Sequence, residues 1–391
     1  MWMAVTFFLL AGAQGFWYPM LSSVLGAYGL DDWVALIFML PPVMSFVSPL
    51  IFGAQVDQRW QAQKVLAWVM GLSGLTLFGA YYVLLANWGA AWFIAIFAFY
   101  SLIYAPAWSL LTVTTLSNLE NPERAFGPIR VWATIGWGGA GFLVSWLGFD
   151  QSARTGMIGA GVCFLAALTS LLLPQTPPKG EVSGRWSDAM GFGALKLLKD
   201  RDLFVYFMTA LVFMIPVSAY YIYTPKFLKE LGVDQVGAAL GVAQIFETFA
   251  MFAMGWVMAR YRAKSILLFA ILCSVVRFVF YSFEDVNWLL AGIALQGILW
   301  TYFFEGGRVF LHRRVPGEMR GQAQTLLGVF TGGFGSLIGT FLVTRLHSTI
   351  VPGYGWSLYW QVLMGVNVVA FLIFFVGYRG GMVKAGVVEG A

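Results

Sequence analysis

Long apolar runs, separated by short charged or Pro- and Gly-rich breaks, follow one another along the whole chain. A helix of about 20 apolar residues is long enough to cross the hydrocarbon core of a bilayer. Only 10% of the 391 residues are charged, whereas a soluble domain carries about 25%. The sequence therefore predicts an all-α membrane protein with twelve transmembrane helices, near residues 4–27, 33–54, 64–86, 90–116, 128–149, 153–173, 202–224, 235–258, 264–283, 286–311, 321–344 and 355–378.

One long polar stretch divides these runs into two sets of six. It covers residues 174–200, PQTPPKGEVSGRWSDAMGFGALKLLKD. Membrane transporters are often built from duplicated bundles, which would give the two halves a pseudo-symmetric relation. We therefore expect a six-helix bundle over 1–173, a cytoplasmic linker over 174–200, a second six-helix bundle over 201–380 and a cytoplasmic tail over 381–391.

The basic residues support this map of spans. With the N-terminus inside, sixteen of the 23 Lys and Arg fall in inner loops, four in outer loops and three within spans. Cytoplasmic loops carry such an excess of Lys and Arg, so both termini are predicted to be cytoplasmic. The net charge of +5 is spread over these loops, which argues against a nucleic-acid partner and for contact with a lipid bilayer.

Motifs for catalysis and for metal or nucleotide binding are absent from the sequence. It contains no HExxH, no GxSxG and no Walker motif, and its two histidines, His312 and His347, fall at predicted span ends. Cys163 and Cys273 lie far apart in apolar runs and form no ligand motif. We expect no enzyme activity, no cofactor, no metal site and no ATP-driven pumping. A receptor or channel stays an alternative to a transporter of a small polar solute.

Four ionisable residues within the spans are the candidates for function: Arg130, Glu247, Glu305 and Arg308. A charge at the bilayer centre costs at least about 2.5–3.5 kcal/mol, so such a residue is a functional candidate by default. Arg277 also lies in a span, the ninth, where we expect it to snorkel or to pair structurally. We place Arg277 outside the predicted site.

Two stripes of polar residues could bind a ligand. Arg130, Thr134 and Trp137 lie at spacings that place a cation, a hydroxyl and an aromatic ring on one helix face. That face suits a ring-bearing polar ligand, although a packing stripe fits the spacing nearly as well. Gln244 and Glu247 share another face and could bind hydroxyl or amide donors; the alternative is a structural interhelical hydrogen bond.

Proton coupling, if present, depends on very few groups. Glu247 and Glu305 are the only acids well inside predicted spans, and no histidine lies in the middle of one. Glu305 and Arg308 are three residues apart, so they could form a silent ion pair or a pair that responds to a proton. The sequence leaves a passive facilitator open.

The loop after the second span, GAQVDQRW, resembles the glycine–aspartate–arginine motif of the major facilitator superfamily. A related segment, GWVMARYRAKS, follows the eighth span. The resemblance implies a fold of two six-helix bundles, transport by alternating access, and a cytoplasmic gate that includes Gly53, Asp57 and Arg59. Without the resemblance, the same loop could be a solvated turn.

A closer resemblance, over most of the chain, is to the nucleoside:proton symporters of that superfamily. Its most specific stretches are PIRVWATIGW, QIFETF and RGQAQTLLGVFTGGFG. It implies symport of a nucleoside-like solute with protons by a monomer in the bacterial inner membrane. Sugar or oligosaccharide permeases, aromatic-acid permeases and a passive facilitator are the alternatives.

The same resemblance assigns the substrate contacts, with three departures from the family pattern. Ser218 and Tyr221 stand where the family has a glutamine and an asparagine on helix 7, and Thr301 stands where it has an aspartate on helix 10. The implied substrate-binding set is Arg130, Thr134, Trp137, Ser218, Tyr221, Gln244, Glu247 and Thr301, with Glu247, Glu305 and Arg308 in proton coupling.

Overall fold

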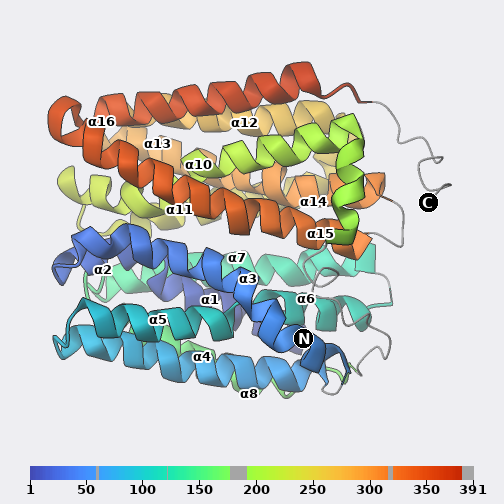
Figure 1. Ribbon diagram of the computed structural model, residues 1–391, viewed down its shortest axis with the longest axis horizontal. Helices are drawn as coiled ribbons and strands as arrows, with labels where there is room; N and C mark the ends of the chain where they lie inside the picture. Colours follow the sequence, from blue (N-terminus) through green and yellow to red (C-terminus); the bar gives the residue numbers. More distant parts are fainter. Residues whose placement is uncertain (59–60, 121, 177–191, 316–319, 381–391) are drawn as a thin grey trace.

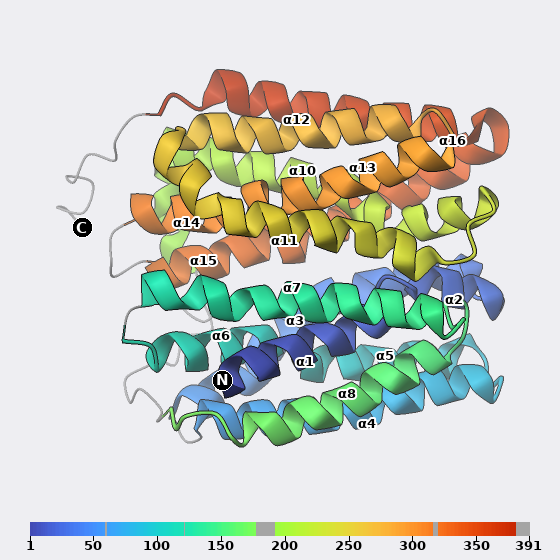
Figure 2. The same ribbon diagram turned by 180° about the vertical axis from the view of Figure 1, so that it is seen from behind.

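The computed structural model shows long helices that run roughly parallel to one another in two groups (Figures 1 and 2). Of residues 49–58, 122–124, 192–194 and 320–322 only the backbone is described. The structure describes residues 1–58, 61–120, 122–176, 192–315 and 320–380.

Helices of the first half of the chain form the lower group in Figure 1. Helix α1 packs against α7 and α8, and α4 packs against α5 and α8. Two crossings are interrupted, between α1 and α2 and between α5 and α6, and each break contains a proline. The helices are α1 (Trp2–Trp17), α2 (Leu21–Ala27), η1 (Asp31–Trp33), α3 (Val34–Gln58), α4 (Ala62–Leu85), α5 (Ala90–Tyr104), α6 (Ala107–Ser117), α7 (Pro122–Trp146) and α8 (Arg154–Ser170).

Helices of the second half form the upper group in Figure 1, where α10 packs against α16 and α12 packs against α13 and α16. Two segments, η3 and η5, are π-helical turns inserted into longer helices. The helices are η2 (Phe192–Lys199), α10 (Arg201–Glu230), α11 (Val236–Arg260), α12 (Ala263–Tyr281), α13 (Val286–Leu299), η3 (Trp300–Glu305), α14 (Gly306–Arg314), α15 (Arg320–Gly328), η5 (Val329–Gly335) and α16 (Ser336–Gly377).

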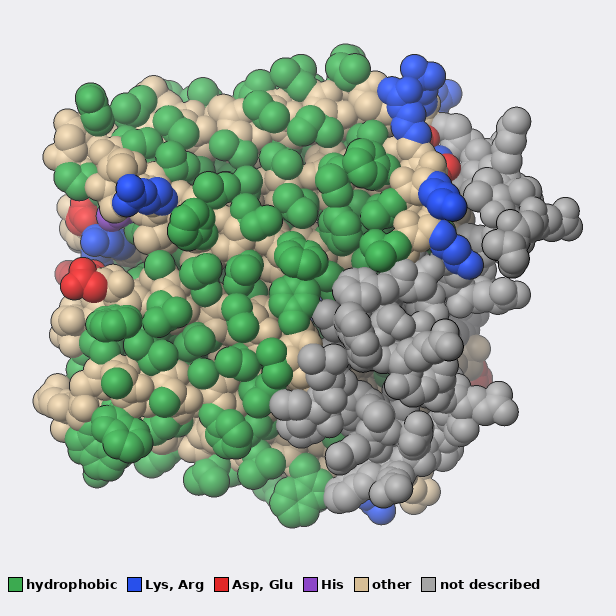
Figure 3. Space-filling model, viewed as in Figure 1, with side chains coloured by type: hydrophobic (Ala, Val, Ile, Leu, Met, Phe, Trp, Pro, Cys, Tyr) green, Lys and Arg blue, Asp and Glu red, His purple; other side chains and the backbone are tan. Residues whose placement is uncertain are grey.

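The described part of the chain contains nine helical stretches that are long and apolar enough to cross a membrane. The longest, Ala323–Gly377, is divided in two at Gly355, whose φ of 80° breaks the helix. The more polar α7 and the shorter α8, 17 residues long, lie alongside the others and complete the twelve predicted crossings. In lipid a helix satisfies its own backbone hydrogen bonds, and apolar side chains cover much of the described surface on the face seen in Figure 3.

The two groups of helices meet along a seam where α7 packs against α11 and α3 packs against α16 and η5. Glycines allow α7 and α11 to approach closely, since a Cβ atom on Gly141 would lie 2.9 Å from the carbonyl oxygen of Gly237. Close approach through small residues stabilises helix pairs in lipid, where van der Waals packing drives association. Side chains of α7 and α11 are thereby brought within hydrogen-bonding distance of each other.

Polar contacts join the two groups at the distal end, which we define as the end of the bundle opposite the end of α16. Asp150 accepts hydrogen bonds from the main-chain N–H of Gly237, at 2.6 Å, and from the hydroxyl of Ser145, at 2.7 Å. The Ser145 hydroxyl in turn accepts from the N–H of Ala238, at 2.8 Å. These groups from the first half cap the N-terminus of α11, whose own N-cap residue makes no side-chain cap. We call this contact between the two groups of helices the distal latch.

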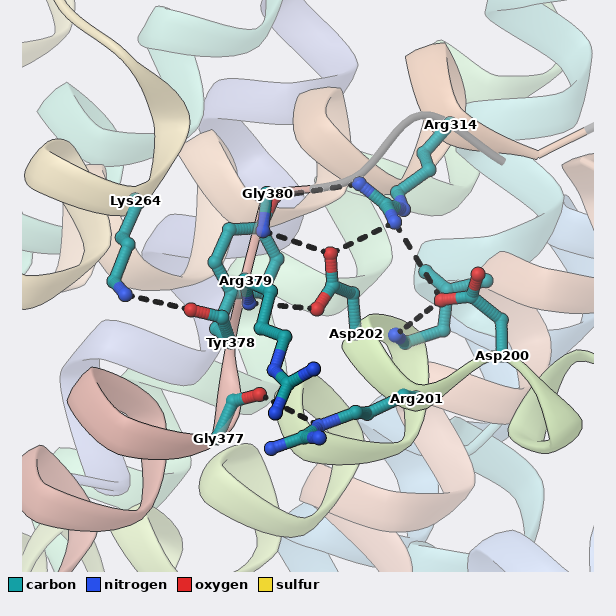
Figure 4. Close-up of polar contacts among 10 residues, drawn as sticks. Asp200, Arg201, Asp202, Lys264, Arg314, Gly377, Tyr378, Arg379 and Gly380 are labelled. Carbon is teal, nitrogen blue, oxygen red and sulfur yellow. Dashed lines mark hydrogen bonds and ion pairs between the residues drawn. The ribbon is translucent and has the colours of Figure 1, made fainter. Parts of the chain in front are cut away.

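A second polar cluster lies at the opposite, terminal end, where α16 ends (Figure 4). The Asp202 carboxylate accepts hydrogen bonds from the main-chain N–H groups of Arg379 and Gly380, at 2.8 and 2.9 Å. It also forms an ion pair with Arg314, at 3.0 Å. One buried carboxylate thus ties the end of α16 to α10 and α14.

We expect Asp202→Ala to lower the free energy of unfolding by about 2 kcal/mol or more, because it removes the acceptor of two main-chain N–H groups and one of the two carboxylates that pair with the mostly buried Arg314. Thermal unfolding of the purified protein in detergent measures this change. The matched control is Asp234→Ala, which removes an exposed carboxylate paired with Lys229 and should cost under about 1 kcal/mol. Equal losses from the two variants would contradict the role given to Asp202.

Candidate functional site

The predicted polar stripe lies on α7 and faces the second half of the molecule across the seam; it consists of Arg130, Thr134 and Trp137. Thr134 is 3% exposed, and its hydroxyl donates to the Oε1 atom of Glu247 on α11, at 3.0 Å. Glu247 is 7% exposed. Among the described residues no cation lies within ion-pair distance of its carboxylate. The predicted polar residues of two separate spans therefore form one buried contact between the halves.

Arg130 lies one turn nearer the terminal end of the same stripe. Its guanidinium is stacked over the ring of Trp108, 4.9 Å from the ring centroid, and is 5.8 Å from the centroid of Phe7. Across the seam it is 3.9 Å from the Oε1 atom of Glu305. Aromatic faces attract a cation more strongly where water is excluded, so the first half of the chain holds this guanidinium in place for a partner on the second half.

Thr301 and Glu305 lie on the π-helical turn η3, which follows α13. The Thr301 hydroxyl donates to the main-chain carbonyl of Glu247, at 3.3 Å. The Glu305 carboxylate lies between two cations, 3.9 Å from Arg130 and 3.9 Å from Arg308. A π-helical turn adds a residue to the helix and redirects the side chains around it, and such turns are frequent at functional sites.

The two intramembrane carboxylates have different electrostatic surroundings. Glu305 is flanked by two arginines, one of which, Arg308, is 60% exposed. Glu247 is buried beside a neutral hydroxyl and forms no ion pair with a described residue, whereas the neighbouring carboxylate of Glu305 does. A buried carboxylate without a cation is costly unless it is hydrogen-bonded or neutralised, so Glu247 is the group of the two that a proton or a ligand would compensate.

A small cavity lies on the distal side of the Thr134–Glu247 contact. Aromatic rings form much of its wall, with Gln244 as a polar group. Tyr18 packs edge-on against two of these rings, at centroid distances of 6.0 Å to Trp137 and 5.3 Å to Tyr221. Its lining residues are Pro19, Trp137, Gly138, Gly141, Tyr220, Tyr221, Gly237, Leu240, Gly241 and Gln244.

Ser218 and Tyr221, the two residues of α10 predicted for the site, have different surroundings. Tyr221 lines the cavity. Ser218 is buried, and its hydroxyl donates to the main-chain carbonyl of Met214, at 2.9 Å, beside Gly339 of α16. The structure thus brings Tyr221 together with Trp137 and Gln244 and places Ser218 against another helix.

The predicted gate falls largely outside what the structure describes. Gly53 and Asp57 lie in the last part of α3, for which only the backbone is described. Arg59 lies outside the described residues. The gating role of these three residues stays a prediction.

Sequence reasoning missed one polar group beside the site, Gln14 of α1. Its Oε1 atom accepts hydrogen bonds from the Trp108 indole, at 3.0 Å, and from the Tyr104 hydroxyl, at 3.3 Å. Because Trp108 packs against Arg130, Gln14 helps to fix the ring that holds the cation. The sequence did carry a signal, since Gln14 is the only amide side chain in α1.

Of the two alternatives predicted for Arg277, snorkelling and structural pairing, the structure excludes the first and agrees with the second. A snorkelling arginine would extend its guanidinium toward an interface, but Arg277 is 0% exposed. Its side chain donates to Gln296 on α13 and to the Ser274 hydroxyl. Helix α12 packs against α13 and α16, and the arginine points into the second half of the molecule rather than to its periphery.

Comparison with solved structures identifies the fold. A crystal structure of a single-residue variant of the nucleoside transporter NupG matches with a TM-score of 0.86 at 21% identity, covering 97% of this chain and 99% of that one. A D-xylose–proton symporter matches with a TM-score of 0.73 at 13% identity, again over 97% and 99%. The predicted fold of two pseudo-symmetric six-helix bundles, the major facilitator fold, is confirmed.

Curated relatives cover nearly the same extent. The proposed nucleoside transporter YegT of Escherichia coli K12 is 29% identical over 357 residues, 85% of this chain and 83% of YegT. The nucleoside permease NupG of the same organism is 24% identical over 359 residues, 86% and 85% of the two chains. The family model described as "Nucleoside H+ symporter" matches residues 1–382. This protein therefore belongs to the nucleoside:proton symporter family, a family of transporters rather than enzymes.

Proposed function

We propose that this protein takes up nucleosides together with protons by alternating access. The observation that carries the proposal is the pair of polar contacts across the seam, Thr134–Glu247 and Arg130–Glu305. Both join the two halves inside the membrane region, where a transported solute would meet them. Their partners lie on four different helical segments, α7, α11, η3 and, through Trp108, α6.

The ligand chemistry follows from the residues around the cavity. Trp137 and Tyr221 line the cavity with aromatic rings, which can pair with a nucleobase. Gln244 offers both a donor and an acceptor, and the Glu247 carboxylate accepts from hydroxyls such as those of a ribose. A ligand with a flat ring and a polyol part satisfies both kinds of wall.

The proton-carrying group of this proposal is Glu247. Because the carboxylate is buried with a hydroxyl and no ion pair, binding a proton removes an uncompensated charge from the membrane interior. Glu305 already has Arg130 and Arg308 beside it. We assign Glu305 and Arg308 to the release of the proton. When the halves move, the carboxylates of Glu247 and Glu305 would compete for Arg130.

Alternating access requires two bodies that move about the site. We propose that residues 1–173 and 201–380 are these bodies, with 174–200 as their cytoplasmic linker and 381–391 as a cytoplasmic tail. Basic side chains of the second half gather at the terminal end (Figures 3 and 4), which supports cytoplasmic termini in a bacterial inner membrane. The distal latch then lies on the outer side, so this conformation is closed to the outside. We expect the transporter to work as a monomer.

Gln244→Ala should weaken binding of uridine about tenfold, the loss expected for one hydrogen bond to a ligand in a buried site. Titration calorimetry on the purified protein measures the Kd. The control is Gln361→Ala, which removes an amide that bonds to Ser357 on the exposed surface of α16. The site is misplaced if both variants bind uridine as the unchanged protein does.

Glu247→Gln imitates the protonated carboxyl group, so it should keep downhill nucleoside exchange and lose accumulation driven by a pH gradient. Uptake of labelled uridine into proteoliposomes, with and without an imposed gradient, measures both. Glu120→Gln, at an exposed position, should keep both activities. A passive facilitator replaces the symporter if the unchanged protein ignores the gradient, and Glu247 loses its role if its variant still accumulates uridine.

Asp150→Ala should open the distal end more often, since it removes the acceptor for the Gly237 N–H and the Ser145 hydroxyl. A cysteine placed at the cavity residue Leu240, in a chain without Cys163 and Cys273, reports this opening. We expect a membrane-impermeant maleimide added outside to label it several-fold faster than with Asp150 present. An unchanged labelling rate would show that the latch does not hold the distal end shut.

A further inference from the structure

One side-chain oxygen of α1, Oε1 of Gln14, joins the two sides of the break between α5 and α6. It accepts a hydrogen bond from the Tyr104 hydroxyl at the end of α5, at 3.3 Å, and one from the Trp108 indole near the start of α6, at 3.0 Å. An indole N–H can only donate, so the atom of Gln14 that faces Trp108 is the carbonyl oxygen. The Trp108 ring is therefore tied at its polar edge to a neighbouring helix.

Aromatic rings, and not hydrogen bonds, hold Arg130 in the first half of the molecule. Its guanidinium carbon lies over the rings of Trp108 and Phe7, at 4.9 and 5.8 Å from their centroids. Its ion-pair partner on the second half, Oε1 of Glu305, is 3.9 Å away, which is beyond hydrogen-bonding distance. In the described part of the chain no group accepts a hydrogen bond from this side chain. The N–H groups of Arg130 are therefore available to an acceptor on a ligand.

The orientation of the Trp108 ring matters because the attraction for a cation acts at the face of the ring. The edge of an aromatic ring carries the opposite partial charge, so a ring that turned its edge to Arg130 would repel it. Gln14, Trp108 and Arg130 lie on α1, α6 and α7, all in the first half of the chain. They form a continuous set of contacts that ends at the seam, where one guanidinium nitrogen faces Glu305.

We propose that Gln14 is a positioning residue, which acts through Trp108 to hold the Arg130 guanidinium with its N–H groups open to the ligand. Because a guanidinium only donates, the ligand atom that meets it is an oxygen or an unprotonated ring nitrogen, groups that a nucleoside carries. This inference rests on the proposed function and deepens it. It gives a part in recognition of the solute to a residue that does not itself line the cavity.

Gln14→Met and Trp108→Phe break the same hydrogen bond from opposite sides with little change in shape. Methionine keeps the length of the side chain, but its sulfur is only a weak acceptor; phenylalanine keeps an aromatic ring beside Arg130 without the indole N–H. Each variant should raise the Kd of uridine about tenfold by titration calorimetry. In proteoliposome counterflow each should raise KM and leave Vmax unchanged. Gln361→Met, the same change on the exposed surface of α16, should behave as the unchanged protein.

Three double variants separate positioning from a purely structural role. Gln14→Met with Trp108→Phe should bind uridine no more weakly than the weaker single variant, because both remove one hydrogen bond. In the Arg130→Met background, Gln14→Met should change the Kd no further, since the residue through which it acts is gone. In the Gln244→Ala background, on the opposite half, Gln14→Met should weaken binding by its usual factor. Structural damage would instead weaken binding equally in both backgrounds.

Several outcomes would overturn the role of Gln14 while leaving nucleoside transport in place. These are wild-type affinity in Gln14→Met or Trp108→Phe, additive losses in their double variant, and an undiminished effect in the Arg130→Met background. Because the two single variants break one hydrogen bond, either decides the matter if the other does not fold. If the unchanged protein binds neither uridine, adenosine nor inosine, the proposed function itself fails, and the role of Gln14 fails with it because no solute then meets Arg130.

Discussion

The cost of placing charge in lipid governs the arrangement of this molecule. Within the described spans, the charged groups of the site are compensated from the opposite half or from an aromatic ring, as Arg130 is by Glu305 and by Trp108. Glu247 relies on the Thr134 hydroxyl. Since these partners lie on different halves, relative movement of the halves exposes charges that must find other partners. A nucleoside and a proton are suitable replacements, because one brings hydrogen bonds and the other removes a charge.

Much of the fold and of the candidate site could be predicted from the sequence, because a chain that crosses lipid can adopt few kinds of structure. Apolar length and the distribution of basic residues specified twelve crossings in two sets, and the fold match confirms them. Ionisable residues are rare inside spans because they are costly there. This rarity identified Arg130, Glu247 and Glu305 as candidates. Helical spacing placed Thr134 on the same face as Arg130, and the structure brings that face against Glu247.

The rest depended on tertiary contacts that helical spacing does not encode. Arg277 lies on a helix away from the seam, and only the packing of α12 on α13 shows that its side chain turns inward to Gln296. The π-helical turn at Thr301 changes the direction of Glu305, whereas α-helical spacing would relate Glu305 to Arg308 alone. Ser218 and Tyr221 are three residues apart on α10, yet the first packs on Gly339 and the second lines the cavity.

These contacts also suggest why coupling between proton and solute can be tight. The Thr134 hydroxyl that donates to Glu247 sits between the cavity and the Arg130–Glu305 pair. A ligand hydroxyl that takes the place of Thr134 would leave the carboxylate hydrogen-bonded to a mobile partner, and moving an ionised carboxylate with it through a low-dielectric interior is unfavourable. In the proposed mechanism the loaded transporter would therefore move most readily when Glu247 is protonated. Binding of the solute and binding of the proton would favour the same conformational step, and symport couples the two in this way.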